Sequence, residues 1–309
     1  MNAIEISFGI VILLQFSIGV SVNMFSLLFY TCMVSDRYKL SSSDLLLTHL
    51  ILANTVMLFT SGISETMHAW GLRDFLDNVG CKIIMYLYRV ARGLAICTTY
   101  FLSIFQAITI SPSTSQWAGI KTKFPKYILP SCILSWILNM LVEIDVLIYM
   151  TGPQNSSSVW IILDLKYCSK ASASAEIALM IVTVRSLRDV FFVGLMSAAS
   201  SYMVFILHRH HRRVQHLRRP GHSTRMMPEV QAARRVIALV TLYVLLYGRQ
   251  SIVLSILLNM KEKSSLLVNS HMVFSLTFAT VSPILMIIND RRIHTIWKRE
   301  PPVSNTDIS

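Results

Sequence analysis

The amino-acid sequence predicts an all-α membrane protein, a bundle of seven transmembrane helices. Three observations predict it: an apolar composition, seven long apolar stretches, and basic residues gathered in alternate connecting segments. Of the 309 residues, 53% are hydrophobic and 14% are charged, and the mean hydropathy is +0.55. Soluble domains use about a quarter charged residues, so a soluble chain of this length would lack the polar surface to cover its core. The composition also excludes a disordered chain, a collagen-like fibre and a small disulfide-rich scaffold.

Seven stretches are long enough to cross a bilayer, whose core requires about 20 mostly apolar residues in a helix. In chain order they cover residues 8–34, 45–63, 83–110, 127–150, 177–207, 236–258 and 267–288, followed by a tail over 289–309. We interpret residues 1–309 as a single seven-helix domain. The first stretch has no Lys or Arg before it and is too long for the core of a signal peptide, so we expect it to be retained. The third and fifth stretches contain charges, and their length leaves room for tilt.

The positions of Lys and Arg predict the orientation of the bundle. Alternate segments are basic, with Arg37, Lys39, Lys121, Lys123, Lys126, Arg291, Arg292, Lys298 and Arg299, and with eight arginines against one acid over 208–235. The other segments mix signs, with Glu65, Asp74 and Asp77 near Arg73 and Lys82, and Glu262 between Lys261 and Lys263. Because basic short loops face the cytoplasm, we expect the N-terminus outside and the C-terminus inside a multi-pass plasma-membrane protein. The net charge of +12 is then a topology signal and does not indicate a nucleic-acid partner.

The expected outward loop over residues 151–176 carries two further signals. Asn155-Ser156-Ser157 matches the acceptor motif for N-glycosylation, on the side of the membrane where modification is possible. Cys168 lies in the same loop and Cys81 at the outer mouth of the third helix, whereas the other cysteines lie within or near apolar helices. We therefore predict a disulfide between Cys81 and Cys168.

Ionisable residues inside the apolar stretches are the first candidates for a functional site, because a charge in the hydrocarbon core is costly. They are Arg89, Arg92, Glu143, Asp145, Arg185, Arg188, Asp189 and Arg249, all in the outer half or at the midplane. They predict a charged, outward-opening cavity between the third, fifth and sixth helices. The candidate ligand-binding residues are Arg89, Arg92, Arg188, Asp189, Tyr247 and Arg249. The alternative for Arg92 or Arg188 is a structural ion pair with Asp189 or Glu143 that holds helices together.

The sign of these charges predicts the ligand class. The outer half of the third helix carries two arginines, Arg89 and Arg92, where a receptor for amines would be expected to carry an acid. A neutral or anionic small molecule is therefore expected. The seventh helix has no Lys that could form a retinal Schiff base, which excludes an opsin.

The basic inward face predicts a docking surface for a cytoplasmic partner, and it is also suited to anionic lipid. Its candidate contact residues are Gln106, Arg209, Arg212, Arg213, Arg234 and Arg235. Beyond the seventh helix, Ile293, Ile296 and Trp297 share one face, which predicts a short amphipathic helix lying on the membrane. The chain contains no HExxH, GxSxG, P-loop or CxxC pattern, so we expect no enzyme activity, no cofactor and no metal site.

Several strings of this chain resemble the vomeronasal type-1 pheromone receptors of the G-protein-coupled receptor superfamily. The matching strings include Leu47–Asn54, Tyr88–Gly93, Leu102–Thr109, Tyr167–Ser169 and Ser201–His210. The Asp-Arg-Tyr motif that ends the third helix in rhodopsin-like receptors is absent, and Gln106 begins the string that replaces it. The resemblance implies a receptor for a small-molecule pheromone or odorant that activates a heterotrimeric G protein of the inhibitory type.

Two alternatives stay open on the sequence. A bitter-taste-type receptor has a similar size and a similarly short N-terminus. A small-solute or anion transporter or channel could use the intramembrane arginines as an anion path, although internal repeats, which transporters often have, are not visible.

Overall fold

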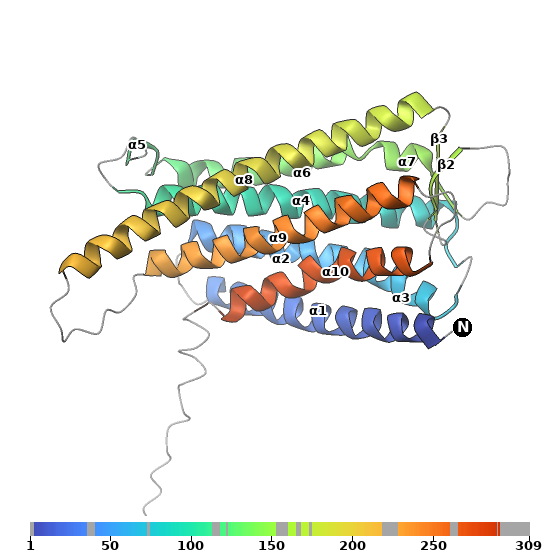
Figure 1. The fold of residues 1–309 in the computed structure, drawn as a ribbon, viewed down its shortest axis with the longest axis horizontal. Helices are drawn as coiled ribbons and strands as arrows, with labels where there is room; N and C mark the ends of the chain where they lie inside the picture. Colours follow the sequence, from blue (N-terminus) through green and yellow to red (C-terminus); the bar gives the residue numbers. More distant parts are fainter. Residues whose placement is uncertain are drawn as a thin grey trace, which may run out of the picture.

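The structure, a computed structural model of the chain, is an elongated bundle of long helices that lie side by side (Figure 1). It describes residues 3–35, 41–72, 75–112, 118–121, 123–152, 160–164, 168–172, 175–217, 228–259, 265–288 and 290. The helices are α1 (Ala3–Ser35), α2 (Ser42–Met57), the π-helix η1 (Leu58–Gly62), α3 (Ile63–Ala69), α4 (Asn78–Ile110), α5 (Ala118–Lys121), α6 (Phe124–Val142), α7 (Asp145–Tyr149), α8 (Ala175–Leu217), α9 (Pro228–Asn259) and α10 (Ser265–Ile288). The strands are β1 (Met150–Thr151), β2 (Trp160–Asp164) and β3 (Ser169–Ser172).

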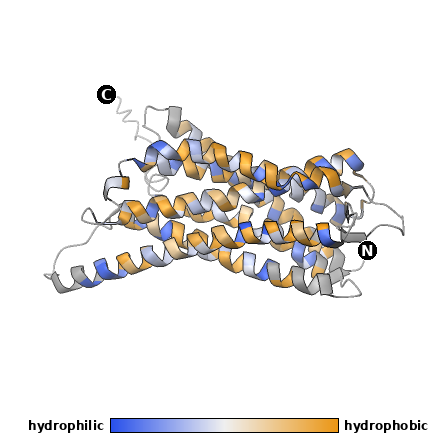
Figure 2. Cartoon of the chain, turned by 90° about the horizontal axis from the view of Figure 1, so that it is seen from above, coloured by the Kyte–Doolittle hydropathy of each residue, from blue (hydrophilic) through white to orange (hydrophobic). Residues whose placement is uncertain are grey.

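Seven helical segments in the described part of the chain are long and apolar enough to cross a membrane, as predicted. They are α1, α2 with η1 and α3, α4, α6 with α7, α8, α9 and α10. Hydrophobic residues cover most of their length (Figure 2). The fifth of them differs most from its predicted bounds, because α8 continues past residue 207 to Leu217 and makes the basic tract 208–213 helical. The predicted amphipathic helix at Ile293, Ile296 and Trp297 lies outside the described residues.

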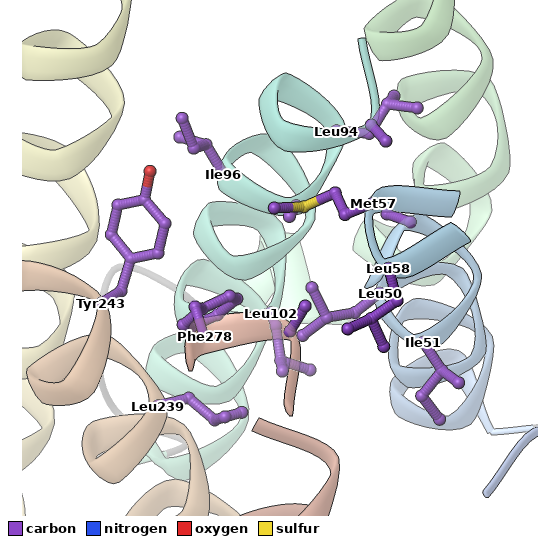
Figure 3. Packing of buried hydrophobic residues seen from close by; sticks show 14 of the residues in the cluster. Leu50, Ile51, Met57, Leu58, Leu94, Ile96, Leu102, Leu239, Tyr243 and Phe278 are labelled. Carbon is purple, nitrogen blue, oxygen red and sulfur yellow. The ribbon is translucent and has the colours of Figure 1, made fainter. Parts of the chain in front are cut away.

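The core of the bundle is built around α4. In the most apolar 18-residue window of α4, 67% of residues are buried inside the protein, against 22% for α1 and for α8. Side chains of α2, α4, α9 and α10 converge there, with Leu102 of α4 near Leu50 of α2 and Phe278 of α10 (Figure 3). The helix α4 is therefore the most deeply buried of the spanning helices.

Local signals set the two ends of α4. Asp77 is the N-cap, and its side chain accepts a hydrogen bond from the backbone N–H of Gly80 at 2.8 Å. The helix ends at Ile110, because its C-cap Ser111 precedes Pro112 and a residue before proline avoids the helical conformation. These signals place Cys81 one turn inside one end of the bundle.

A π-helical turn interrupts the second spanning segment. It covers Leu58–Gly62, and Gly62 lies so close to α1 that a Cβ there would come within 2.5 Å of the Phe16 ring. The extra residue of a π-turn rotates the chain that follows it. The prediction that Glu65 belongs to a loop is wrong: it lies in α3, and only 4% of it is exposed.

A small antiparallel sheet, which the all-α prediction did not include, closes one end of the bundle. Its strand order is β1-β3-β2, and Met150 pairs with Lys170 and Ile161 with Ala171. Cys168, directly before β3, forms a disulfide with Cys81 of α4, which confirms the predicted pair. We call this end the disulfide end and the opposite one, where α8 ends and α9 begins, the basic end. The glycosylation motif at Asn155 lies outside the described residues.

The helix α10 is joined to α1 and α2 by buried amide side chains. Asn23 of α1 donates a hydrogen bond to the backbone carbonyl of Ala279 at 2.9 Å. Asn54 of α2 donates to the hydroxyl of Ser282 at 2.8 Å. Hydrogen bonds of this kind hold helices together where no water competes. The three helices α1, α2 and α10 therefore form one polar-bonded side of the bundle.

Candidate functional site

A cavity lies between α2, α4, α9 and α10 in the half of the bundle toward the disulfide end. It is lined by Met57, Tyr88, Arg92, Ala95, Tyr243, Leu246, Tyr247, Gln250, Phe274, Ser275 and Phe278. The sequence predicts a cavity between the third, fifth and sixth helices, whereas α8, the fifth spanning helix, contributes no residue to the lining of this one, and α2 and α10 do. The reason is that the charges of α8 are turned toward α6 and α7.

The volume of this cavity is about 30 Å³. One water molecule needs roughly 10–15 Å³ by this measure, so the space corresponds to about two waters. Ligand cavities of drug-sized molecules are roughly tenfold larger or more. A ligand of drug-like size can therefore enter only if the lining side chains move apart.

Arg92 is the charged residue of the cavity lining. Its Nη2 lies 3.8 Å from Oδ2 of Asp189, which is longer than the usual 2.7–3.2 Å of a hydrogen bond. Its side chain is 26% exposed, and within the described part of the chain this long ion pair is its only one. A guanidinium carries five N–H donors, so Arg92 retains donors for a ligand.

Aromatic rings of α9 and α10 form the apolar wall of the cavity. Tyr243 stacks on Tyr247, with 6.0 Å between the ring centroids and 15° between the planes. The edge of Tyr243 also meets Phe278 in a T-shaped pair at 5.1 Å. Such pairs add about 0.5–1.5 kcal/mol to the burial of the rings. The wall suits an apolar molecule that carries a few polar atoms.

Glu65 lies behind the cavity wall, at a position that the sequence does not predict. Its Oε1 accepts hydrogen bonds from Ser61 at 2.7 Å and from Ser275 at 2.9 Å. Its Oε2 is buried without a hydrogen-bond partner among the described residues. Ser275 also lines the cavity, as Arg92 does, so a carboxyl group stands directly behind the lining. The signal available in the sequence was the run from Leu45 to Ser64, which is free of Asp, Glu, Lys and Arg and reaches Glu65 without a proline.

Arg188 and Asp189, two of the ligand-binding candidates, belong to a network of ion pairs that joins α8 to α6 and α7. Arg188 lies 2.9 Å from Glu143 and 2.9 Å from Asp189. It also donates to Oδ1 of Asn139 at 3.2 Å. These contacts are those of the structural alternative raised from the sequence, in which the arginine holds helices together.

Arg185 completes this network. It lies 2.8 Å from Oε2 of Glu143, and it also pairs with Asp145. Glu143, Asp145 and Arg185 are all at least nine-tenths buried, so each charge needs its partner. With Arg92, the network contains three arginines and three acids, and it is electrically balanced.

Arg89 and Arg249, two further candidates, do not line the cavity. Arg249 lies over the ring of Phe274, with 3.2 Å from Cζ to the centroid, and donates to Ser270 at 2.7 Å. Arg89 is half-buried on α4, and the described residues offer it no ion pair within 4.0 Å. Of the six predicted ligand-binding residues, the cavity brings together Arg92 and Tyr247.

The candidates at the basic end divide into two groups. Arg209, Arg212 and Arg234 are exposed, whereas the side chain of Arg213 lies outside the described part. Gln106 is buried and donates to Ser43 of α2 at 3.0 Å, so it faces a neighbouring helix. Arg235 is turned toward Asp290, with 3.7 Å between Nη1 and Oδ2. Across the residues that the structure describes, no group of three His, Cys, Asp or Glu side chains could hold a metal ion.

Comparison with known proteins gives a consistent assignment. A sequence model of the vomeronasal organ pheromone receptor family matches residues 6–299. Vomeronasal type-1 receptor 4 of Homo sapiens is 38% identical over 291 residues, which cover 93% of this chain and 97% of that receptor. Vomeronasal type-1 receptor 3 of Homo sapiens is 37% identical over 295 residues, covering 95% of this chain and 94% of that receptor.

A more distant relative extends the comparison. Olfactory receptor class A-like protein 1 of Danio rerio is 33% identical over 286 residues, covering 92% of this chain and 90% of that protein. The range that the family model matches includes all seven spanning segments and both cysteines of the disulfide. The chain belongs to the vomeronasal organ pheromone receptor family and is a multi-pass membrane receptor of the chemosensory G-protein-coupled type.

Proposed function

We propose that this receptor binds a small neutral or anionic molecule, a pheromone or odorant, beside Arg92 and in response activates a heterotrimeric G protein of the inhibitory type. The receptor family implies ligand binding and G-protein coupling in general. The ligand class rests on one observation, namely that Arg92 is the charged member of the cavity lining and that no residue of this lining is an acid.

Arg92 favours such a ligand because a cationic amine in the cavity would be repelled by the guanidinium group, and a low-dielectric surrounding screens this repulsion little. A carbonyl, hydroxyl or sulfate oxygen could instead accept a hydrogen bond from it. Tyr247 would contact the apolar part of the ligand, next to Tyr243. Arg89 and Arg249 would make the electrostatic potential around the site more positive. Arg188 and Asp189 would hold Arg92 in place, because Asp189 pairs with both arginines.

The orientation follows from the charges of the basic end. It faces the cytoplasm in this proposal, with the disulfide end and the N-terminus outside. The exposed arginines of the extended α8 and of α9, Arg209, Arg212 and Arg234, would contact the G protein together with Arg213. Gln106 would become accessible only if α4 and α2 separated near Ser43.

Ligand binding would reach the basic end through α9. This helix supplies Tyr243, Leu246, Tyr247 and Gln250 to the cavity lining. Because the cavity holds about 30 Å³, a larger ligand must displace some of these side chains, and it would bind best to the helix arrangement in which they lie further apart. Such a difference in affinity is what shifts a receptor population toward its active state.

The test is ligand-dependent nucleotide exchange by the full receptor in lipid nanodiscs. A panel of volatile and steroid-like compounds is screened with an inhibitory-type G protein, and each active compound is then repeated with stimulatory-type and other subtypes. We expect exchange with the inhibitory type, by neutral or anionic compounds, and loss of response in Arg92→Ala at matched receptor amounts. A response restricted to cationic amines, or solute flux through receptor-containing liposomes without nucleotide exchange, would contradict the proposal.

A further inference from the structure

One carboxylate joins three elements at the basic end of the bundle. Asp290, just after α10, lies 3.7 Å from Nη1 of Arg235 on α9, measured from Oδ2. The same Oδ2 accepts a hydrogen bond from the hydroxyl of Tyr30 on α1 at 3.2 Å. Only 11% of the Arg235 side chain and 3% of the Asp290 side chain are exposed.

The surroundings of this ion pair strengthen it. Ala233, Val236 and Leu239 of α9 are buried on the same part of the helix. An ion pair with little exposure and apolar neighbours is screened far less than one on the surface. Removing one partner would take a countercharge away from the other, whose side chain is poorly solvated.

The two sides of the ion pair are not equally fixed. Asp290 follows α10, which is bonded to α1 and α2 through Asn23 and Asn54. Tyr30 adds a bond from α1 to Asp290 itself. The carboxylate is therefore held by the polar-bonded side of the bundle, and Arg235 ties α9 to it.

The helix α9 also connects this ion pair to the cavity. Arg235 and Tyr243 are eight residues apart, which is about 12 Å along a helix. No proline interrupts the chain between Pro228 and Pro283, so α9 has no proline kink over this distance. The cavity wall and the contact between Arg235 and Asp290 therefore lie on one continuous helix, so a displacement of α9 at Tyr243 would be carried toward Arg235.

We propose that the Arg235–Asp290 ion pair, with Tyr30, is a latch that holds the basic end of α9 closed in the ligand-free receptor. Opening of α9 for G-protein binding requires this ion pair to break, and loss of the ion pair raises basal signalling. The inference rests on the proposed function for its signalling consequence. It assigns Arg235, a predicted partner-contact residue, to an intramolecular role in the closed state.

The first test measures basal nucleotide exchange without any ligand. Asp290→Asn and Arg235→Gln should each raise the basal rate roughly five- to tenfold, at the lower end of the usual range of coupling between two sites. Arg235→Lys keeps the charge and should stay near the wild-type rate. Lys126→Gln is the matched control, since it removes one positive charge from an exposed position at the start of α6 that is not among the proposed G-protein contacts. Exchanging the pair, Arg235→Asp with Asp290→Arg, should lower the basal rate again.

The second test measures the position of α9 independently of any G protein. Spin labels are attached to the native exposed Cys32 on α1 and to a cysteine replacing Arg234, with the buried Cys97 and Cys132 replaced by alanine. Double electron–electron resonance in nanodiscs should show a longer distance in Asp290→Asn than in the parent receptor. Arg235→Lys should leave the distance distribution unchanged.

The outcomes separate the latch from the proposed function. If the distance increases but no variant activates a G protein, the latch holds and the signalling function is rejected. An unchanged distance in Asp290→Asn overturns the latch, whatever the signalling result. A basal rate in Lys126→Gln that rises as much as in Arg235→Gln also overturns it, because the effect would then come from net charge alone.

Discussion

Glu65 on α3 accepts a hydrogen bond from Ser275 on α10, with 2.9 Å between Oε1 and Oγ. The contact joins the second and seventh spanning segments directly beside the cavity, since Ser275 belongs to its lining. Ser61 in the π-turn donates to the same carboxyl oxygen at 2.7 Å. A single buried acid therefore organises the wall of the cavity that Ser275 forms.

Replacing Glu65 by Leu should destabilise the receptor by about 1–3 kcal/mol, because the hydroxyl of Ser61 loses its acceptor and that of Ser275 keeps only the backbone carbonyl of Met272. Glu65→Gln keeps the volume and an acceptor oxygen, so it should cost less than Glu65→Leu. The apparent melting temperature of the detergent-solubilised receptor measures both. A melting temperature of Glu65→Leu equal to that of the wild-type receptor would show that the carboxyl group does not hold this wall.

The sequence was sufficient for the helices and the disulfide, because each depends on local or one-dimensional properties. Length and hydropathy locate a spanning segment whatever its neighbours are. Cys81 and Cys168 could be paired because the topology places both at one end of the bundle. Helix ends beyond the bilayer, such as the continuation of α8 to Leu217, do not depend on membrane thickness and were underestimated.

The site was predicted less well, because it depends on how each helix is rotated about its axis. The sequence predicts that Arg188 and Asp189 of α8 line a ligand cavity, whereas Arg188 is turned to Glu143 at the end of α6. The π-turn at Leu58–Gly62 changes the side of the helix on which Glu65 lies. The spacing of apolar residues in the sequence does not reveal this turn. Of the predicted ligand-binding residues, Arg92 and Tyr247 were placed in the cavity lining.

Glu143 is the centre of the ion-pair network, since it contacts Arg185 at 2.8 Å and Arg188 at 2.9 Å. Glu143→Gln should remove the negative charge that the guanidinium groups of Arg185 and Arg188 share. We expect it to lower the free energy of unfolding by an amount toward the lower end of about 3–5 kcal/mol. We expect reduced cell-surface expression and a lower apparent melting temperature. Glu176→Gln, on the exposed start of α8, is the matched control and should change neither. Similar losses of expression and melting temperature in both variants would contradict a structural role of the network.

Gly93 allows α4 to approach this network closely. A Cβ at position 93 would overlap Oδ1 of Asn139 and lie 3.4 Å from Nη1 of Arg188. Gly93→Ala should therefore displace both side chains and cost about 1–3 kcal/mol, as overpacking does. In Gly194→Ala on α8 the new Cβ meets nothing within 4 Å, so stability should be unchanged or slightly higher. Thermal unfolding of the two variants side by side measures the difference, and a stable Gly93→Ala receptor would contradict the close contact.

Arg92 and Arg249 are both arginines near the cavity, and their contacts predict different effects on ligand response. Arg92 lines the cavity and makes a single long ion pair among the described residues. Arg92→Gln should therefore lower the potency of an active compound by about tenfold or more, because one charge-assisted hydrogen bond of about 1.5–3 kcal/mol is lost. Arg249 is already engaged by Ser270 and the ring of Phe274, so Arg249→Gln should change potency less. Concentration–response curves for nucleotide exchange, at matched surface expression, compare the two. If Arg249→Gln is the more damaging variant, the ligand lies nearer the disulfide end than this cavity does, because Ser270 and Arg249 are closer to that end than Tyr243 and Phe278 are.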